Sequence, residues 1–201
     1  MIKTLRNPVI RVGPDDHGRR MSLDDFDRAI GREGYLYELN KGVIDVVDVP
    51  EPSHGRQFQE LRDQLVGYRL SHPGVVTFIG GGAEAKLLIG PPQSERHPDI
   101  VVYTSAPPEV EDVWSTWVPE IVVEIVSARS AKRDYVDKPP EYLAFGVDEY
   151  WIVDAAKLQM TALTRWRGQW NEQIIKPGKK YKTRRLPGFA LDLRRVFAVL
   201  R

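Results

Sequence analysis

The sequence predicts a mixed α/β protein in which short buried strands alternate with amphipathic helices. Three apolar runs, at 98–103, 119–126 and 149–154, are rich in β-branched residues and bounded by turn formers, which is typical of buried strands. Apolar residues recur at helical spacing in 53–71, and a proline–glycine pair follows. A chain of 201 residues is long enough to bury a sizeable core around such elements.

The composition excludes several classes of protein. A hydrophobic fraction of 42% and a charged fraction of 28% are typical of a soluble globular domain. The sequence has no cysteine, which excludes disulfides, thiolate metal sites and a cysteine nucleophile. No apolar run approaches the roughly 18 residues of a membrane span, and residues 1–6 lack the apolar core of a secretory signal. We therefore expect a cytoplasmic protein.

The net charge of +1 does not indicate a nucleic-acid-binding protein, but the charge is unevenly distributed. Residues 157–201 hold twelve lysines and arginines against two acids, Glu172 and Asp192. Such a basic region can contact phosphate groups. It can equally be the solvated face of a strand, and the sequence leaves both interpretations open.

The N-terminal part is expected to contain an arm and a short helix. Residues 1–20 show no hydrophobic period and predict a loosely held arm, with a single domain over 21–201. Residues 21–30 predict a helix that Ser22 caps, with Ile30 at the end of its apolar stripe.

Two pairs of short strands are predicted next, each joined by a turn that contains glycine. The first pair, 35–39 and 43–49, flanks Asn40-Lys41-Gly42, a typical hairpin turn. The second pair, 75–79 and 85–89, flanks three consecutive glycines. These glycines lack the Lys-Ser/Thr of a phosphate-binding P-loop, so they predict a flexible turn.

Two of the central strands carry a carboxylate where an apolar residue is expected, Asp99 in the first and Glu124 in the second. A buried carboxylate costs several kcal/mol unless it is paired or bound to a metal. Two of them, with Lys138 nearby in the sequence, indicate a divalent-cation site. The alternative is that Glu124 pairs with a single arginine or lysine and only stabilises the fold.

The segment after Glu124 predicts a turn and then a helix with Asp134 and Lys138 one turn apart on one face. Pro139-Pro140 is unfavourable inside a continuous helix, so we expect a kink, or a restart with a proline in the first turn of the second piece. Gly146 is the expected C-cap. The rest of the chain predicts a strand meander and a short final strand or helix, at 158–166, 169–175 and 189–199.

Two further polar residues have more than one interpretation. Glu38 lies near the end of a predicted strand, where an exposed edge charge is the commoner role. His54 lies in the first turn of a predicted helix, where a surface or capping residue is commoner than a ligand.

Several motifs together resemble a known family. They are Glu-Leu-Asn-Lys-Gly (38–42), Pro-Glu-Pro-Ser-His (50–54), Pro-Asp-Ile-Val-Val (98–102), Val-Glu-Ile-Val-Ser (123–127), the series Asp134, Lys138, Tyr142, Gly146, and Gly-Val-Asp-Glu-Tyr-Trp-Ile-Val-Asp (146–154). This pattern resembles the Uma-type putative endonucleases, a bacterial family within the PD-(D/E)XK restriction-endonuclease-like superfamily. The resemblance covers residues 21–200.

The resemblance implies a restriction-endonuclease-like α/β (α+β) fold, with a central mixed β-sheet flanked by helices. It implies that Asp99, Glu124 and the backbone carbonyl of Ile125 hold Mg²⁺ or Mn²⁺. Lys138 would orient or deprotonate the attacking water, and Glu38 would support the metal shell. His54 also matches the family pattern. One departure is that the usual lysine, two residues after the second acid, is replaced by valine, so Lys138 must supply the ammonium from the following helix.

The expected function is that of a Mg²⁺-dependent endonuclease that hydrolyses DNA, with duplex DNA as the substrate and a homodimer as a possible form. Two alternatives remain open at this stage. One is a non-catalytic DNA-binding or protein-interaction module on a nuclease fold, and the other is a hydrolase of some other phosphoester.

Overall fold

The computed structural model describes residues 9–47, 51–127 and 129–199. The chain divides into two compact units, Met1–Val49 with Leu88–Arg96, and Pro50–Leu87 with His97–Arg201. None of the helices in these described ranges is long and apolar enough to cross a membrane.

The first unit is built from short strands. A four-stranded sheet has the order β4-β3-β7-β6, and a two-stranded parallel sheet joins β1 to β2. The elements are β1 (Arg11–Val12), α1 (Leu23–Asp27), β2 (Ile30–Gly31), β3 (Leu36–Asn40), β4 (Val43–Val47), β6 (Leu87–Ile89) and β7 (Ser94–Arg96).

The hairpin predicted in this unit is confirmed. Strands β3 and β4 pair in antiparallel register and are joined by Lys41 and Gly42. Both residues have positive φ, at 51° and 76°, as a two-residue type I′ turn requires. The end of the second predicted strand, residues 48–49, lies outside the described residues.

The predicted first helix is shorter than expected. Ser22 caps it as predicted, because its hydroxyl accepts the N–H of Asp25 at 3.2 Å. The helix then ends at Asp27, and Ile30 is 51% exposed in β2 rather than packed on a helical stripe. Within the predicted arm, residues 9–20 include β1 and an isolated bridge from Arg20 to Val43. Whether residues 21–201 form one domain stays a prediction.

The second unit contains a six-stranded mixed sheet of order β12-β11-β10-β9-β8-β5. Only β9 and β10 run parallel; the other neighbours pair antiparallel. This confirms the predicted mixed sheet. The elements are α2 (Pro52–Ser71), β5 (Phe78–Gly80), β8 (Ile100–Tyr103), β9 (Ile121–Val126), α3 (Lys138–Phe145), β10 (Glu149–Asp154), β11 (Gln159–Trp166), β12 (Gln169–Ile175), β13 (Lys180–Tyr181), β14 (Leu191–Asp192) and α4 (Leu193–Ala198).

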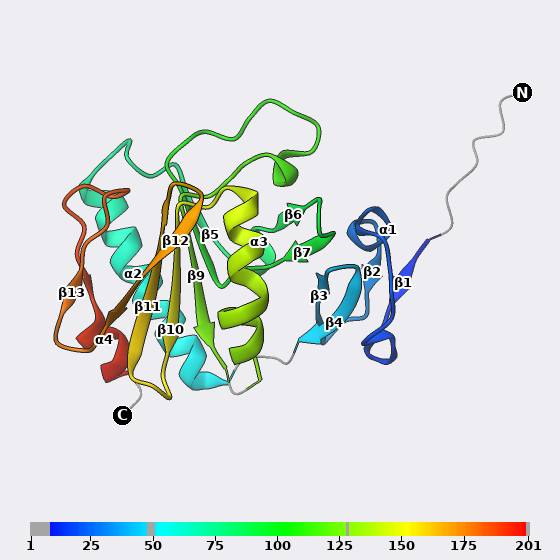
Figure 1. The fold of residues 1–201 in the computed structure, drawn as a ribbon, viewed down its shortest axis with the longest axis horizontal. Helices are drawn as coiled ribbons and strands as arrows, with labels where there is room; N and C mark the ends of the chain where they lie inside the picture. The colour runs from blue at the N-terminus through cyan, green and yellow to red at the C-terminus, as the bar shows by residue number, and fades with distance from the viewer. Residues whose placement is uncertain (1–8, 48–50, 128, 200–201) are drawn as a thin grey trace, which may run out of the picture. The chain divides into compact units, whose positions relative to one another are not determined.

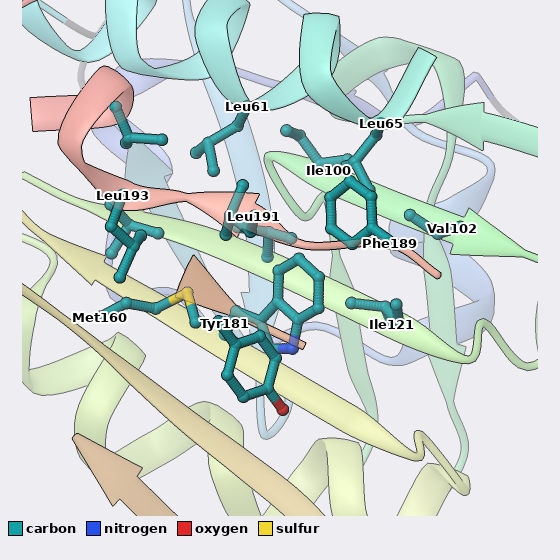
Figure 2. Close-up of a cluster of buried hydrophobic side chains, with 14 of the residues drawn as sticks. Leu61, Leu65, Ile100, Val102, Ile121, Met160, Tyr181, Phe189, Leu191 and Leu193 are labelled. Carbon is teal, nitrogen blue, oxygen red and sulfur yellow. The ribbon is translucent and has the colours of Figure 1, made fainter. Parts of the chain in front are cut away.

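Helices cover both faces of this sheet (Figure 1). On one face, Leu61 and Leu65 of α2 pack with Ile121 of β9 and Leu193 of α4 in the main apolar cluster (Figure 2). On the other face lies α3, whose Tyr142 reaches a side chain of β9. Because side chains alternate along β9, its isoleucines and Val123 join the apolar cluster while Glu124 points toward α3. Glu124 thus points away from the main apolar cluster.

The prediction of a strand pair around the three glycines is wrong. Strand β5 belongs to the six-stranded sheet and β6 to the four-stranded sheet. The glycines permit a close backbone approach instead: a Cβ on Gly81 would lie 1.8 Å from the carbonyl oxygen of Asp99. The Gly82 N–H also donates to the Pro98 carbonyl at 2.8 Å. The glycine run therefore supports the backbone that carries Asp99.

The C-terminal elements follow the predicted order. Strands β11 and β12 form the expected meander. The final segment, predicted as a strand or a helix, contains both β14 and α4.

Candidate active site

Strand register brings Asp99 and Glu124 together. Ile100 of β8 pairs with Val123 of β9 in an antiparallel ladder. The residue before Ile100 therefore lies opposite the residue after Val123, which places Asp99 beside Glu124. Residues directly opposite one another in such a ladder have Cβ atoms about 4.5–5.5 Å apart and share a face of the sheet. The two carboxylates predicted from the sequence are thus cross-strand neighbours.

Asp99 is held through one of its two carboxylate oxygens. Its Oδ2 accepts the backbone N–H of Ile125 at 2.7 Å and lies 3.3 Å from Nε2 of His54. Its Oδ1 has no hydrogen-bond partner among the described residues. The side chain is 22% exposed, so this oxygen can receive a ligand from solvent.

Glu124 is almost completely buried, at 4% exposure. Its Oε1 lies 2.9 Å from the Lys138 ammonium and accepts a hydrogen bond from the Tyr142 hydroxyl at 2.7 Å. The ammonium offsets part of the hydration that this buried carboxylate loses. Glu124 therefore forms an ion pair with a lysine, as the alternative interpretation of the sequence expected.

Lys138 reaches Glu124 despite the two prolines that follow it. Residues Arg133–Asp137 form a π-helical segment, and α3 begins at Lys138 with a proline in its first turn. A proline lies in the first turn of α3, as predicted, but Asp137 and Lys138 both have helical backbone angles, so the chain passes from the π-helical segment into α3 without a break. Segments of π-helix often occur at functional sites, and this one ends at the lysine of the site.

Asp134 is the second carboxylate around Lys138. Its Oδ1 lies 3.1 Å from Nζ of Lys138, and the side chain is 1% exposed. Its Oδ2 accepts a hydrogen bond from Ser130, and the Tyr150 hydroxyl donates to its backbone carbonyl at 2.9 Å. The prediction that Asp134 and Lys138 share a helical face is confirmed.

His54 contacts the site from the first turn of α2. Burial lowers the pKa of its imidazole, but the hydrogen bond and the charge of Asp99, with a hydrogen bond to the Ile125 backbone, outweigh this effect and raise the pKa above 6.5. Only the carbonyl of Ile125 can accept from an imidazole N–H. His54 is therefore a partner of two of the predicted metal ligands and not a surface residue.

Glu38 lies in the first unit, whereas Asp99, Glu124 and Lys138 lie in the second. It is 6% exposed and its Oε2 is 3.2 Å from Nη1 of Arg96, which is fully buried. The interpretation of Glu38 as an exposed edge charge is wrong. A buried ion pair is needed because Arg96 has no access to water at this point.

The donor set fits a hard divalent cation more closely than a soft one. Among the described residues, no group of three or more His, Cys, Asp or Glu side chains has the arrangement of a complete metal site. Two carboxylates and a carbonyl oxygen, with the remaining positions taken by water, is the way in which Mg²⁺ is usually bound. Asp99 Oδ1, Glu124 and the Ile125 carbonyl are therefore suited to Mg²⁺ or Mn²⁺.

The sequence missed three contributors to this site: the support of Asp99 by Gly81, the hydroxyl of Ser130 on Asp134, and the Tyr142 hydroxyl on Glu124. Tyr142 had a signal, since it lies four residues after Lys138 and so on the same helical face. The contact with Gly81 had none, because no local pattern connects this glycine to Asp99.

The chain is similar to known proteins. The family model of the Uma2 family, whose description is "Putative restriction endonuclease", matches residues 23–194. The chain belongs to the Uma2 family. Among curated proteins, none matches its sequence.

A solved structure supports the same fold. The crystal structure of a putative nuclease belonging to DUF820, from Anabaena variabilis ATCC 29413, is similar to this Uma2 protein with a TM-score of 0.72. The likeness covers 90% of this chain and 99% of that chain, at 18% sequence identity. The nuclease-like fold expected from the motifs is thus confirmed.

Proposed function

We propose that this Uma2 protein is a Mg²⁺- or Mn²⁺-dependent endonuclease that hydrolyses phosphodiester bonds of DNA. One arrangement carries the proposal: Ile100 pairs with Val123, which brings the preceding Asp99 toward Glu124, and the Lys138 ammonium lies 2.9 Å from Glu124. Two acids and a lysine at one place on a mixed sheet are the groups that metal-assisted phosphodiester hydrolysis requires. Membership of a family of putative restriction endonucleases supports the same reaction.

The cation would be held by Asp99, Glu124 and the carbonyl of Ile125. When bound, such a cation acidifies a water molecule and neutralises charge that develops on the phosphate. The protein contributes fixed ligands: the Ile125 N–H holds Asp99, and Tyr142 holds Glu124. These contacts restrict the positions that the two carboxylates can take.

Lys138 supplies a positive charge next to Glu124. A buried ammonium is strongly attractive to a phosphate oxygen because little water screens it. We propose that it orients the attacking water and stabilises the negative charge of the phosphate in the transition state. Glu38 is proposed to support the metal shell, as the family resemblance implies, and His54 to hold Asp99 in place.

Duplex DNA and a homodimer are further parts of the proposal. Two copies of the chain would provide one active site for each strand of a duplex. A plasmid assay that separates nicked from linear product, together with the mass of the protein in solution, tests both points.

The first experiment is calorimetric titration of Mn²⁺ into wild type, Asp99→Ala and Asp63→Ala. Asp63 is an exposed acid on α2 and is the matched control. We expect binding in wild type and in the control, and none in Asp99→Ala. Absence of binding in wild type would argue against a preformed cation site.

The second experiment incubates the three proteins with supercoiled plasmid, single-stranded DNA and RNA, each with Mg²⁺ or Mn²⁺. Cleavage of DNA by wild type and by Asp63→Ala, but not by Asp99→Ala, is the expected result. Retention of DNA without cleavage under either cation would favour a non-catalytic module. Cleavage of RNA alone would favour a hydrolase of another phosphoester.

A further inference from the structure

Lys138 is held between two buried carboxylates, of which the proposed reaction uses one. Its Nζ lies 2.9 Å from Glu124 Oε1 and 3.1 Å from Asp134 Oδ1. Asp134 is the more deeply buried of the two acids, at 1% exposure against 4%. It follows the turn after β9 and is not on the strand that carries the proposed metal ligands.

Asp134 is itself fixed from three directions. The Ser130 hydroxyl donates to Oδ2 of Asp134, and the backbone N–H of Asp134 donates to the Ser130 carbonyl at 2.9 Å. The Tyr150 hydroxyl donates to the backbone carbonyl of Asp134 at 2.9 Å. Ser130 is further tied to the end of β9, because its hydroxyl accepts the N–H of Ser127 at 2.8 Å. Buried networks of this kind hold a side chain in a single arrangement.

This rigidity matters when Glu124 binds a cation. An oxygen of Glu124 that turns toward a divalent ion attracts the ammonium less strongly, since the two positive charges repel. A lysine with Glu124 as its single partner would then be free to change rotamer. Asp134 lies outside the proposed ligand set and can keep Lys138 in place.

We propose that Asp134 is a positioning residue, which holds the Lys138 ammonium next to the substrate phosphate while Glu124 binds the cation. This inference rests on the proposed nuclease function. In this proposal Asp134 contacts neither the substrate nor the cation. Replacing Asp134 should therefore slow the reaction without weakening the binding of DNA or of the cation.

The test compares wild type, Asp134→Asn and Ser130→Ala in plasmid cleavage, Mn²⁺ titration and thermal unfolding. Asparagine keeps the shape of Asp134 but removes its charge, so we expect kcat to fall roughly 10–10²-fold, with KM and the Mn²⁺ affinity within about threefold of wild type. Ser130→Ala keeps the charge of Asp134 but removes the hydroxyl that holds its carboxylate, and should give a smaller fall of kcat.

Each other outcome overturns the inference. Unchanged kcat in a folded Asp134→Asn protein means that Glu124 alone positions Lys138. A loss of Mn²⁺ affinity that accompanies the loss of activity means that Asp134 acts on the cation. A wild type that binds Mn²⁺ but cleaves nothing removes the proposed function and this inference together, whereas an active Asp134→Asn removes only the inference.

An independent observation concerns the basic segment 176–185, in which six of ten residues are lysine or arginine and none is acidic. Buried and exposed side chains alternate along its middle. Tyr181 and Thr183 are each 7% exposed and donate hydrogen bonds to Glu149 at 3.0 and 2.6 Å. The neighbouring cations point outward, and they form a surface that we name the basic stripe: Lys180, Lys182 and Arg184.

The basic stripe is not neutralised by the protein. Among the described residues, none of its three side chains makes an ion pair or a hydrogen bond. Elsewhere exposed arginines are paired, as Arg28 is with Asp25 and Arg195 with Glu60. Three uncompensated cations on an anchored segment repel one another, and an anionic partner would relieve that repulsion.

The geometry points to the phosphate backbone of DNA as the partner of the basic stripe. The stripe follows the face that contains Glu149, while Glu124 points to the other face, so this is a separate contact surface. It would retain DNA without taking part in cleavage, and it requires only that the chain binds DNA.

The test measures binding of a labelled duplex in EDTA, over a series of salt concentrations. One variant replaces Lys180, Lys182 and Arg184 with glutamine, and the matched control replaces Arg19, Arg28 and Arg195, which are exposed and paired. Three lost phosphate contacts should reduce the slope of log K against log salt by about 2.7, and the affinity roughly 10²-fold at 0.1 M salt. The control should keep the wild-type slope.

An unchanged slope in the stripe variant would overturn this assignment, as would an equal loss in the control, which would show a general effect of net charge. Binding of wild type to anionic vesicles with no binding to DNA would assign the stripe to a membrane surface instead.

Discussion

The six-stranded sheet has buried carboxylates on both faces, and two of them, Glu124 and Glu149, are stabilised in different ways. Glu124, on the face toward α3, has a buried ammonium and one hydroxyl as partners. Glu149, on the opposite face, is 2% exposed and accepts hydrogen bonds from three uncharged donors, at distances of 2.6–3.0 Å. Two of these donors, Tyr181 and Thr183, belong to the C-terminal segment that covers this face.

Glu149 and Glu124 differ in whether an oxygen at their site is left for an external ligand. The donors around Glu149 use both of its oxygens and close the site within the protein, so this carboxylate joins β10 to the C-terminal segment. Glu124 lies beside Asp99, whose Oδ1 is without a protein partner in the described part of the chain. A buried acid becomes a candidate for function where a neighbouring oxygen is left for an external ligand.

The sharpest test of this comparison is activity. Asp99→Asn and Glu124→Gln should each reduce plasmid cleavage by about 10²–10³-fold, because each removes a charge that the transition state requires. Glu149→Gln should leave kcat within about threefold of wild type. Equal losses in all three folded variants would contradict the assignment of the two faces.

Next in size is the stability effect of the buried lysine. Lys138→Met leaves Glu124 and Asp134 buried without their ammonium, and should lower the free energy of unfolding by about 3–5 kcal/mol. Urea denaturation measures this loss. Lys132, which is 79% exposed, is the control, and Lys132→Met should change stability by less than about 0.5 kcal/mol. A small loss in Lys138→Met would mean that the site is hydrated.

The carboxylate on the other face should have a smaller effect. Glu149→Leu leaves the donors of Trp151, Tyr181 and Thr183 without their acceptor, and should cost about 1–3 kcal/mol in urea denaturation. The Mn²⁺ affinity should not change. A loss of Mn²⁺ binding in this variant would show that the two faces are coupled.

The smallest expected effect is the pH dependence that His54 contributes. Its pKa is raised above 6.5, so the folded state binds the proton more tightly than the unfolded state. The stabilisation is present below the unfolded pKa and is lost as the pH rises through the folded pKa. The stability difference between wild type and His54→Gln should therefore shrink as the pH is raised from 6.5, which urea midpoints over a pH series would show.

Asp154 should give a pH dependence of stability with the opposite sign. Burial raises the pKa of its carboxyl, but hydrogen bonds from the Lys157 backbone and from Tyr135, with the Lys157 charge, outweigh this and lower the pKa below 3.8. Its stabilisation is present above the unfolded pKa and is lost as the pH falls through the folded value. Asp154→Asn should therefore differ from wild type at neutral pH and converge with it in acid. If the stability difference from wild type changed with pH in the same direction for His54→Gln and Asp154→Asn, these assignments would be contradicted.

Much of the candidate site was predictable from the sequence. Runs of β-branched residues identified β9, which carries Glu124, and β8, which begins directly after Asp99 and not before it as expected. The period of side chains along a strand is a local property. The spacing of Asp134 and Lys138 predicted one helical face, and the double proline predicted a helical piece with a proline in its first turn, which is α3. The resemblance to the family added the roles that we propose for these residues.

Residues outside the local pattern could not be placed in this way. Glu38 and Arg96 are 58 positions apart in the sequence, and Thr183 is 34 positions from Glu149. The three glycines had the composition of a turn, but the approach of Gly81 to Asp99 depends on how β5 pairs with β8. Strand pairing over such distances leaves no trace in the spacing of neighbouring residues.

The sequence by itself determined the secondary structure around the site, the identity of its acids and lysine, and the family, because these depend on short-range periodicity and on residue type. The tertiary structure alone decided that Lys138 has two carboxylate partners, that Glu149 is satisfied by uncharged donors, and that the basic stripe has no partner within the described part of the chain. Those outcomes depend on which side chains meet after long-range packing, and packing is decided by the burial of the whole core.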